Sequence, residues 1–376
     1  MNPVARLLRE LIALPSVNPA VLPTGDPNAG ERRVAEFLAA TAAQAGLEVE
    51  LREVLPGRPN VLARLTPSRR IRHRVLLAPH TDTVGGESEG IFKPVERSGR
   101  LHGRGACDTK GSVAAMLTAL IELARGSGRP KHTEIVFAGL IDEENAQAGS
   151  RALVAGGFQA DLAIVGEPTR LEVVTAHKGD LWLQLETSGR AAHGSRPELG
   201  RNAVHAMARV VDLLETTYAR QLRKQRHPLL GHPTINVGTI RGGAQPNIVP
   251  DRCGISLDRR TLPGERDAAV RREILALLKR HRLPARMLDL RTAACPALET
   301  DVRLPLVRQF MDAVGQQRPV GVHYFCDAAV LAARGSPSVV FGPGNIAQAH
   351  TADEWVSLRQ LEEAGRILLG FFRSLP

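Results

Sequence analysis

The stretch "LLAPHTDTVGG", Leu76–Gly86, joins an apolar run to two polar side chains. The run has the length of a buried strand, and it ends at Pro79, directly before His80. On a strand, residues i and i+2 face the same side, so the carboxylate of Asp82 can reach the imidazole ring of His80. The stretch therefore predicts a buried strand that presents a His–Asp pair at its carboxyl end.

Signals for strands and helices alternate along the first half of the chain. Helices are expected over 31–46, over 112–125 and from Ser150, where apolar residues recur at helical spacing. Strands are expected at "LEVELREV", "NVLARL", "RVLLAP", "TEIVFAGLI" and "LAIVG". This alternation predicts an α/β fold with a mostly parallel sheet flanked by helices, in which ligands bind at the carboxyl ends of the strands.

The pattern changes near residue 178. The strand "DLWLQLETSG" is followed by a long amphipathic helix, by the strands "PTINVGTI" and "CGISLDRR", by a second helix and by the strand "ARMLDL". This β-α-β-β-α-β order is typical of a small two-layer α+β sandwich. We therefore expect one domain formed by residues 1–177 and 291–376, with a second domain, residues 178–290, inserted into it.

The composition narrows the classes of protein to consider. Hydrophobic residues make up 43% and charged residues 23% of 376, and no apolar run approaches the ~18 residues of a membrane span. The formal net charge of +10 could favour nucleic acid, but the basic residues are scattered and aromatic residues make up only 3%. A positive field suits small anionic substrates better, so we expect neither a nucleic acid nor a membrane partner.

Cysteine usage and the N-terminus indicate a cytoplasmic protein. The four cysteines are far apart and form no Cys-x-x-Cys pair, which is typical of reduced thiols. The opening stretch "MNPVARLLRELIALPS" carries charges where a signal peptide needs its apolar core.

Five stretches place acidic residues or histidines directly after apolar runs that we expect to be strands. Each alone has a structural explanation: Asp108 could cap the helix that follows, and His350 could be a surface histidine. Together, at one edge of a sheet, they would supply imidazole and carboxylate ligands for two divalent metal ions that clamp a substrate oxygen and lower the pKa of a shared water. Nitrogen and oxygen ligands with open positions suit zinc, with cobalt or manganese as substitutes. The five stretches are "PHTDTV", "GRGACDTKG", "LIDEEN", "VGEPT" and "QAHTADE".

The ordered set of motifs resembles a known family. The family is that of the dinuclear zinc amidohydrolases and peptidases, which includes acetylornithine deacetylase, succinyl-diaminopimelate desuccinylase, aminoacylase and carboxypeptidase G. The resemblance covers nearly the whole chain and is strongest to acetylornithine deacetylase-like members. It rests on "PHTDTV", "GRGACDTKGSVAAML", "DEEN", "GEPT", "AAHGSRPELGRNAV", "DRRTLPGE" and "FGPGNIAQAHTADEWV".

The resemblance implies a complete set of metal ligands in the first domain, which would be the catalytic, metal-binding domain. His80 and Glu167 would hold one zinc ion. Glu144 and His350 would hold the other. Asp108 would bridge both ions.

The resemblance also implies the roles of the groups around the metal ions. Glu143 would be the general base, which takes a proton from the water bridging the two metals and returns it to the leaving amine. Asp82 would support His80. The family also places a cis peptide bond directly after the bridging aspartate, here Asp108–Thr109.

The inserted domain resembles the lid and dimerisation domain of the family. His193 would reach the active site of the partner subunit in a homodimer and stabilise the tetrahedral oxyanion. Asn247 would help to bind substrate, and Arg260 would hold the substrate carboxylate with both arms of its guanidinium group. Arg259 should point to the opposite face of the same strand.

The function expected from this resemblance is metal-dependent hydrolysis of the amide bond of N-acyl-amino acids, in which the metal-bridging water attacks the acyl carbon. Three alternatives stay open. A dipeptidase, a carboxypeptidase or a desuccinylase could use the same metal site, because specificity pockets are loop features. A non-catalytic binding protein would be favoured by loss of Glu143 or of two ligands. A nucleic-acid binder would need a continuous arginine face.

Overall fold

The computed structural model describes residues 2–86, 89–290 and 293–376, and these form two compact units. The first unit comprises Met1–Thr175, Thr300–Val320 and Cys326–Pro376, and the second comprises Ala176–Glu299 and Gly321–Phe325. The expected return to the first domain at residue 291 falls on residues outside the described ranges, so that boundary stays a prediction.

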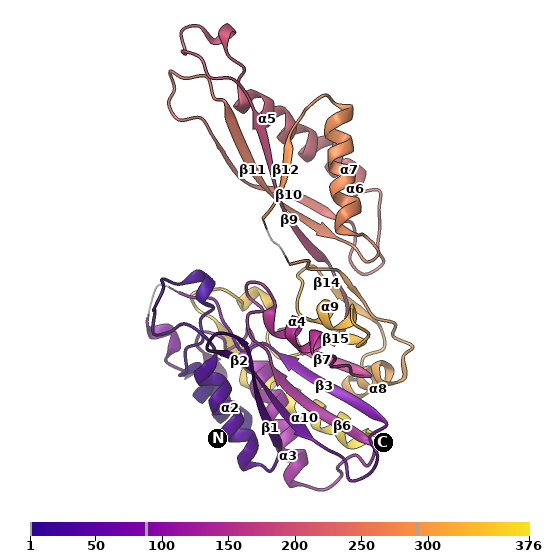
Figure 1. Ribbon diagram of the computed structural model, residues 1–376. Helices are drawn as coiled ribbons and strands as arrows, with labels where there is room; N and C mark the ends of the chain where they lie inside the picture. Colours follow the sequence, from indigo (N-terminus) through magenta and orange to yellow (C-terminus); the bar gives the residue numbers. More distant parts are fainter. Residues whose placement is uncertain (1, 87–88, 291–292) are drawn as a thin grey trace. The chain divides into compact units, whose positions relative to one another are not determined.

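The first unit is built on a mixed sheet whose middle strands are parallel (Figure 1). The predicted α/β fold with a mainly parallel central sheet is confirmed, but the strand pairs at both edges are antiparallel. At one edge the first two strands are joined by a short link, which requires them to be antiparallel, since neighbouring parallel strands need a crossover of a dozen or more residues. The strands run in the order β1 (Glu48–Leu55), β2 (Arg58–Leu65), β6 (Thr133–Gly139), β3 (His73–Pro79), β7 (Leu162–Gly166), β15 (Ser338–Val340) and β8 (Val174–His177).

Helices cover both faces of this sheet. In β3, Val75 and Leu77 belong to the core shared with α1, α2, α3, α8 and α10, while Leu76 and Ala78 are buried on the other face. Burial on both faces explains why the opening stretch is continuously apolar. Figure 1 shows α3 beside α10, and α4 contacts α9. The helices are α1 (Pro3–Ile12), α2 (Arg32–Gln44), α3 (Lys110–Arg125), α4 (Ala148–Ala155), α8 (Pro305–Val314), α9 (Ala328–Ala332) and α10 (Leu358–Ser374).

A small antiparallel sheet joins two distant segments of the first unit. β5 (Arg100–His102) pairs with β4 (Val95–Arg97) on one side and with β16 (Trp355–Ser357) on the other. This sheet was not predicted, because strands of three residues carry too little periodicity to be recognised.

The second unit is a four-stranded antiparallel sheet with helices packed on one face. Along β9, Leu181, Leu183 and Leu185 are buried with α5 and α7, while Trp182 is partly exposed. The predicted β-α-β-β-α-β order is confirmed, and the long helix contains a π-helical turn, Leu213–Tyr218. The sheet order is β10 (Thr234–Gly242), β11 (Arg252–Thr261), β9 (Gly179–Ser188) and β12 (Arg286–Asp289), and the helices are α5 (Ala203–Asp212), α6 (Ala219–Leu222) and α7 (Asp267–Arg280).

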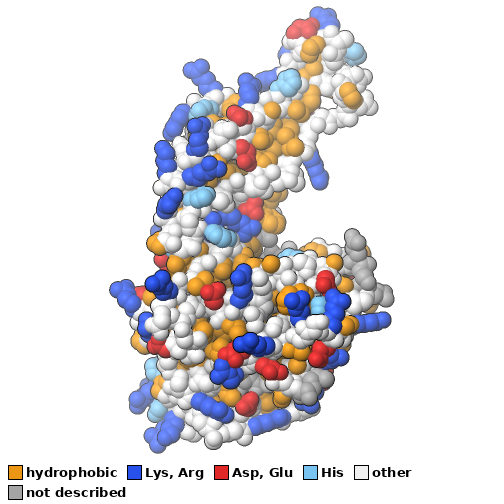
Figure 2. Space-filling model, turned by 180° about the vertical axis from the view of Figure 1, so that it is seen from behind, with side chains coloured by type: hydrophobic (Ala, Val, Ile, Leu, Met, Phe, Trp, Pro, Cys, Tyr) orange, Lys and Arg blue, Asp and Glu red, His pale blue; other side chains and the backbone are white. Residues whose placement is uncertain are grey.

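Charge is dispersed over the face of the molecule that Figure 2 shows. On the face in Figure 2, Lys and Arg side chains are scattered and interspersed with Asp and Glu. Within the described ranges, none of the helices combines the length and the apolar character that crossing a bilayer requires.

His177 is expected to make stability sensitive to acid. Its ring is buried, and burial lowers the pKa of His177 to about 4 from an ordinary value of 6.5. Below pH 6.5 the unfolded chain therefore binds a proton at His177, whereas the folded chain does not bind it until about pH 4. The free energy of unfolding is therefore unaffected by His177 above pH 6.5 and falls as the pH drops below that value. The loss is roughly 3 kcal/mol between these pH values. Urea unfolding as a function of pH should show a flatter acid limb in His177→Gln, and an unchanged limb would contradict the assignment.

Candidate metal centre

The first ligand cluster lies at the ends of two adjacent parallel strands. Pro79 and Gly166 are register partners at the ends of β3 and β7, so the next residues, His80 and Glu167, emerge side by side. Nε2 of His80 is 3.1 Å from Oδ1 of Asp108 and 3.8 Å from Oε1 of Glu167. All three side chains are buried, and their ligand atoms lie within 4.8 Å of one another.

The second cluster uses the other oxygen of the same aspartate. Nε2 of His350 is 3.3 Å from Oδ2 of Asp108 and 3.1 Å from Oε1 of Glu144. These ligand atoms also lie within 4.8 Å of one another. The two oxygens of Asp108 thus face two different histidines, which is the geometry of a bridging carboxylate.

Two of these residues do not follow strands of the central sheet, contrary to the expectation from the sequence. Asp108 lies at the N-terminal end of α3, where Thr109 is the N-cap and no side chain caps the helix. The Asp108–Thr109 peptide bond is cis, as the family resemblance implied. His350 follows a short 3₁₀ turn, Ile346–Gln348, and has a positive φ of 60°. The sheet therefore presents only part of the site, and loops bring the rest.

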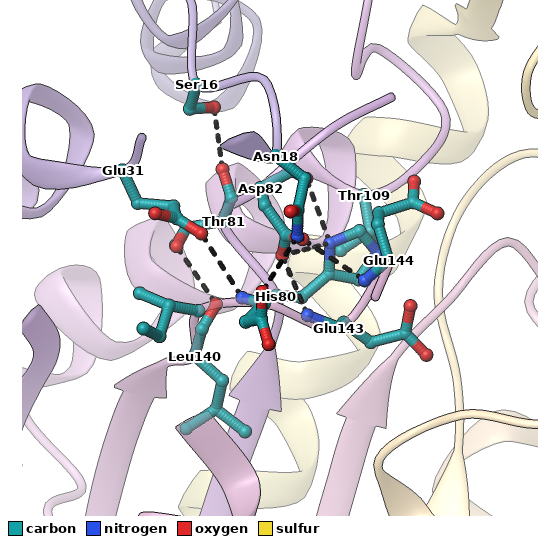
Figure 3. A network of polar contacts seen from close by, with 12 residues as sticks. Ser16, Asn18, Glu31, His80, Thr81, Asp82, Thr109, Leu140, Glu143 and Glu144 are labelled. Carbon is teal, nitrogen blue, oxygen red and sulfur yellow. Dashed lines mark hydrogen bonds and ion pairs between the residues drawn. The ribbon is translucent and has the colours of Figure 1, made fainter. Parts of the chain in front are cut away.

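Asp82 contacts both the ring of His80 and the backbone of the loop that carries Glu143 and Glu144. Nδ1 of His80 is 3.0 Å from the backbone carbonyl of Asp82 and 3.4 Å from its carboxylate. The carboxylate accepts hydrogen bonds from the backbone amides of Glu143 and Glu144, each at 3.1 Å (Figure 3). Asp82 therefore fixes the loop that carries two of the predicted functional glutamates.

Polar residues from the N-terminal region complete this support. The side-chain amide of Asn18 donates to Asp82 at 2.8 Å and to Asp142 at 3.0 Å. Arg58 makes two hydrogen bonds of 2.6 Å to Glu31 and one of 3.0 Å to Asp142. Sequence patterns do not identify Asn18, Glu31 or Arg58 as part of this support, because nothing in the local sequence shows which distant side chain each one contacts.

Replacing Arg58 by methionine is expected to destabilise the fold strongly. The side chains of Glu31 and Asp142 are 0% and 2% exposed, so both carboxylates would stay buried without their cation. Breaking such a buried pair costs about 3–5 kcal/mol in the free energy of unfolding. Arg32→Met is the control, since Arg32 pairs with Glu53 at a half-exposed site, and it should cost less than about 1 kcal/mol. Equal urea midpoints for the two variants would contradict the prediction.

Glu143 lies close to the ligands but in neither cluster. Burial, and then the neighbouring carboxylate of Glu167, raise the pKa of Glu143 well above its ordinary value. A carboxylate with a raised pKa is a stronger proton acceptor when ionised and a ready donor when protonated.

The donor set fits divalent cations. Burial, and then the charge of Asp108, raise the pKa of Glu167, and burial likewise raises the pKa of Glu144. Hydrogen bonds to Asp108 and Glu144 raise the pKa of His350 to about 10, so the carboxylates draw positive charge to this point. Buried carboxylates crowded around two imidazoles are stable only with compensating positive charge, and metal ions supply it.

The other three predicted site residues lie in the second unit. His193 forms an isolated bridge with Ile248, and the amide of Gly194 donates to the carbonyl of Asn247 at 2.7 Å, so the His193 and Asn247 segments are neighbours. Both residues are exposed. Nδ1 of His193 is 2.7 Å from the hydroxyl of Ser195.

Arg260 and Arg259 point to opposite faces of β11, as predicted. Nε and Nη2 of the partly exposed Arg260 donate to the two oxygens of Asp258 at 2.8 and 2.9 Å. Arg259 is fully buried and donates to Glu265 at 2.5 Å and to the hydroxyl of Tyr218 at 3.4 Å.

Comparison with known proteins places the chain in a family. The model of peptidase family M20/M25/M40 matches residues 76–374. An acetylornithine deacetylase of Proteus mirabilis is 31% identical over 96% of this chain and 94% of that protein, and one of Aliivibrio fischeri is 30% identical over 90% of both. Two solved structures share the fold at 19% identity: a metallo-carboxypeptidase of Sulfolobus solfataricus (TM-score 0.78, 99% of both chains) and a tripeptidase of Staphylococcus aureus (TM-score 0.79, 99% of this chain and 97% of that one). The chain therefore belongs to peptidase family M20/M25/M40 and is a hydrolytic enzyme that acts on carbon–nitrogen bonds.

Proposed function

We propose that this hydrolase cleaves the amide bond of N-acyl-amino acids, as an acetylornithine deacetylase-like deacylase that uses two divalent metal ions. The observation that carries the proposal is the pair of ligand clusters that share Asp108, each oxygen of which faces a different histidine. Curated relatives at about 30% identity that are named acetylornithine deacetylase support the substrate class. Zinc is the first choice of metal because the ligands are imidazole nitrogens and carboxylate oxygens, and cobalt or manganese could replace it.

In the proposed mechanism His80 and Glu167 would hold one ion, Glu144 and His350 would hold the other, and Asp108 would offer one oxygen to each. When bound, such ions would supply Lewis-acid chemistry, namely a more polarised acyl carbonyl and a lower pKa for water.

The proton transfers are assigned to Glu143. Its carboxylate takes a proton from the attacking water and then delivers that proton to the nitrogen of the leaving amine. Asp82 keeps Glu143 in place through the hydrogen bond to its backbone amide.

Substrate recognition is assigned to the second unit, which we propose acts as a lid and dimerisation domain. Arg260 would bind the substrate α-carboxylate, since Asp258 engages one edge of its guanidinium group and the opposite edge carries further donors. Asn247 would contact substrate, and His193 would stabilise the oxyanion in the partner subunit of a homodimer.

A panel of substrates tests the deacylase assignment. N-acetyl-, N-succinyl- and N-formyl-amino acids and dipeptides would be incubated with the zinc- or cobalt-loaded protein, and the released amine would be measured. Preferred turnover of N-acetyl-amino acids is expected. Preferred turnover of dipeptides would support a dipeptidase or carboxypeptidase instead, preferred turnover of N-succinyl substrates a desuccinylase, and no turnover with metal bound would refute hydrolysis of these classes.

Mixing inactive variants tests the homodimer. One variant, His193→Ala, lacks the imidazole of His193 and the other, Glu143→Ala, lacks the carboxylate of Glu143. In a mixed dimer, the active site of the His193→Ala subunit keeps its own Glu143 and receives His193 from the other subunit, so part of the activity should be recovered. No recovery after subunit exchange would count against sharing of His193 between subunits.

Small-molecule chemistry in the cytoplasm is the remaining part of the proposal. The four cysteines all lie among the described residues, where they are buried and form no disulfide bonds with one another, which suits a reducing compartment. The scattered positive charge in Figure 2 suits small anionic substrates and offers no continuous basic face to nucleic acid on the side shown.

A further inference from the structure

We propose that Glu354 is a positioning residue for the metal centre: its carboxylate holds the loop Gly105–Asp108 so that the two oxygens of Asp108 face the two histidines. The inference rests on the proposed function in one respect, namely that Asp108 binds metal ions.

The carboxylate of Glu354 accepts four hydrogen bonds. Oε2 receives Nη1 of Arg104 at 2.8 Å and the amide of Gly105 at 2.9 Å. Oε1 receives the amides of Cys107 and Asp108 at 2.8 and 2.9 Å. Glu354 is only 3% exposed, so these donors, rather than water, solvate its charge.

This arrangement does more than pair a buried arginine. A simple ion pair would need only Arg104, whereas three of the four donors are backbone amides of the loop that ends in Asp108. Hydrogen bonds to a charged acceptor are about twice as strong as neutral ones. The carboxylate therefore fixes the backbone on which the bridging side chain stands.

Glu354 also connects the two segments that supply Asp108 and His350. It lies four residues after His350 and directly before β16, which pairs with β5 just upstream of the loop. Its own backbone carbonyl accepts the amide of Gly103 at 3.0 Å. One residue thus sets the spacing between two ligands of the second cluster.

Glu354→Gln is the variant that tests the inference. Glutamine keeps the size of the side chain but turns one acceptor oxygen into an NH₂ group that faces amide donors. The Kd for zinc and cobalt, measured by spectroscopic titration, should rise about 10–100-fold, as is usual when a group that orients a metal ligand is changed. In the metal-free protein, the amides of Cys107 and Asp108 should exchange hydrogen about 10-fold faster because they lose a charged acceptor.

Asp353→Asn is the matched control. It also removes one carboxylate charge, but from the neighbouring residue, whose side chain is exposed and contacts Arg97 and His102. It should change neither metal affinity nor exchange at residues 105–108. Glu354→Asp keeps the charge but is one methylene shorter, so it should give an intermediate Kd and serves if the glutamine variant folds poorly.

Two results would overturn the inference. One is wild-type metal affinity in Glu354→Gln. The other is exchange that accelerates throughout the first unit instead of at the loop, which would make Glu354 a general stabiliser of the fold. If the wild-type chain bound no divalent ions, the proposed function would fail, while the exchange data would still decide whether Glu354 holds the loop.

Discussion

Glu143→Gln is expected to lower turnover strongly and to leave metal binding intact. Glutamine has nearly the same shape but cannot take a proton from water or return one to the amine. General acid–base catalysis contributes about 10²–10⁴-fold to the rate, so kcat should fall by a factor within this range or larger. Because Glu143 belongs to neither ligand cluster, metal content should be unchanged.

The measurement is kcat and KM for the best N-acyl-amino acid, together with metal content by atomic emission. Glu362→Gln is the control, since Glu362 is an exposed glutamate on the same unit. Loss of a metal ion in Glu143→Gln would make Glu143 a ligand rather than the base, and activity within a factor of about ten of wild type would leave it without the proposed role.

Asp108→Ala is expected to have the largest effect on metal binding. Asp108 contributes an oxygen to each of the two clusters, whereas His80 and His350 each belong to one. Removing its carboxylate should weaken the binding of both metal ions, and activity should fall below detection. His80→Ala, in contrast, should lose one ion and keep the other.

Metal stoichiometry and thermal melting with and without added zinc distinguish these outcomes. Zinc should raise the melting temperature of the wild type by mass action, since the folded ligand clusters should bind it more tightly than the unfolded chain does, and this shift should vanish in Asp108→Ala. An Asp108→Ala chain that binds two ions with wild-type affinity would refute the shared-ligand geometry. An unchanged number of bound metal ions in His80→Ala would refute the assignment of His80, in "PHTDTV", as a metal ligand.

The position of His80 at a strand end was predictable because the apolar run directly before it marks a buried strand. A strand that is buried on both faces must be apolar throughout, so the polar residues that follow Pro79 mark its carboxyl end. The same reasoning places Glu167 after "LAIVG". The parallel register that sets His80 beside Glu167 pairs two distant segments and is a feature of the folded sheet.

The hydrogen bonds around these residues were not predictable from local pattern. Asn18 meets Asp82 and Asp142 across 64 and 124 residues of sequence. Glu354 meets Asp108 across 246 residues, although it lies within a motif that the sequence marked as functional. No periodicity encodes such a pairing, since only the packed backbone decides which donors a buried carboxylate finds.

The sequence by itself determined the α/β class, the inserted β-α-β-β-α-β element and the residue types of the candidate site, because strand and helix periods and short motifs are local properties of the chain. The tertiary structure alone decided that the two oxygens of Asp108 face different histidines, that Asp82 accepts hydrogen bonds from the amides of Glu143 and Glu144, and that the central sheet has antiparallel strand pairs at both edges. These features depend on contacts between segments far apart in the chain, and the free energy of such contacts is set by burial and geometry that exist only after folding.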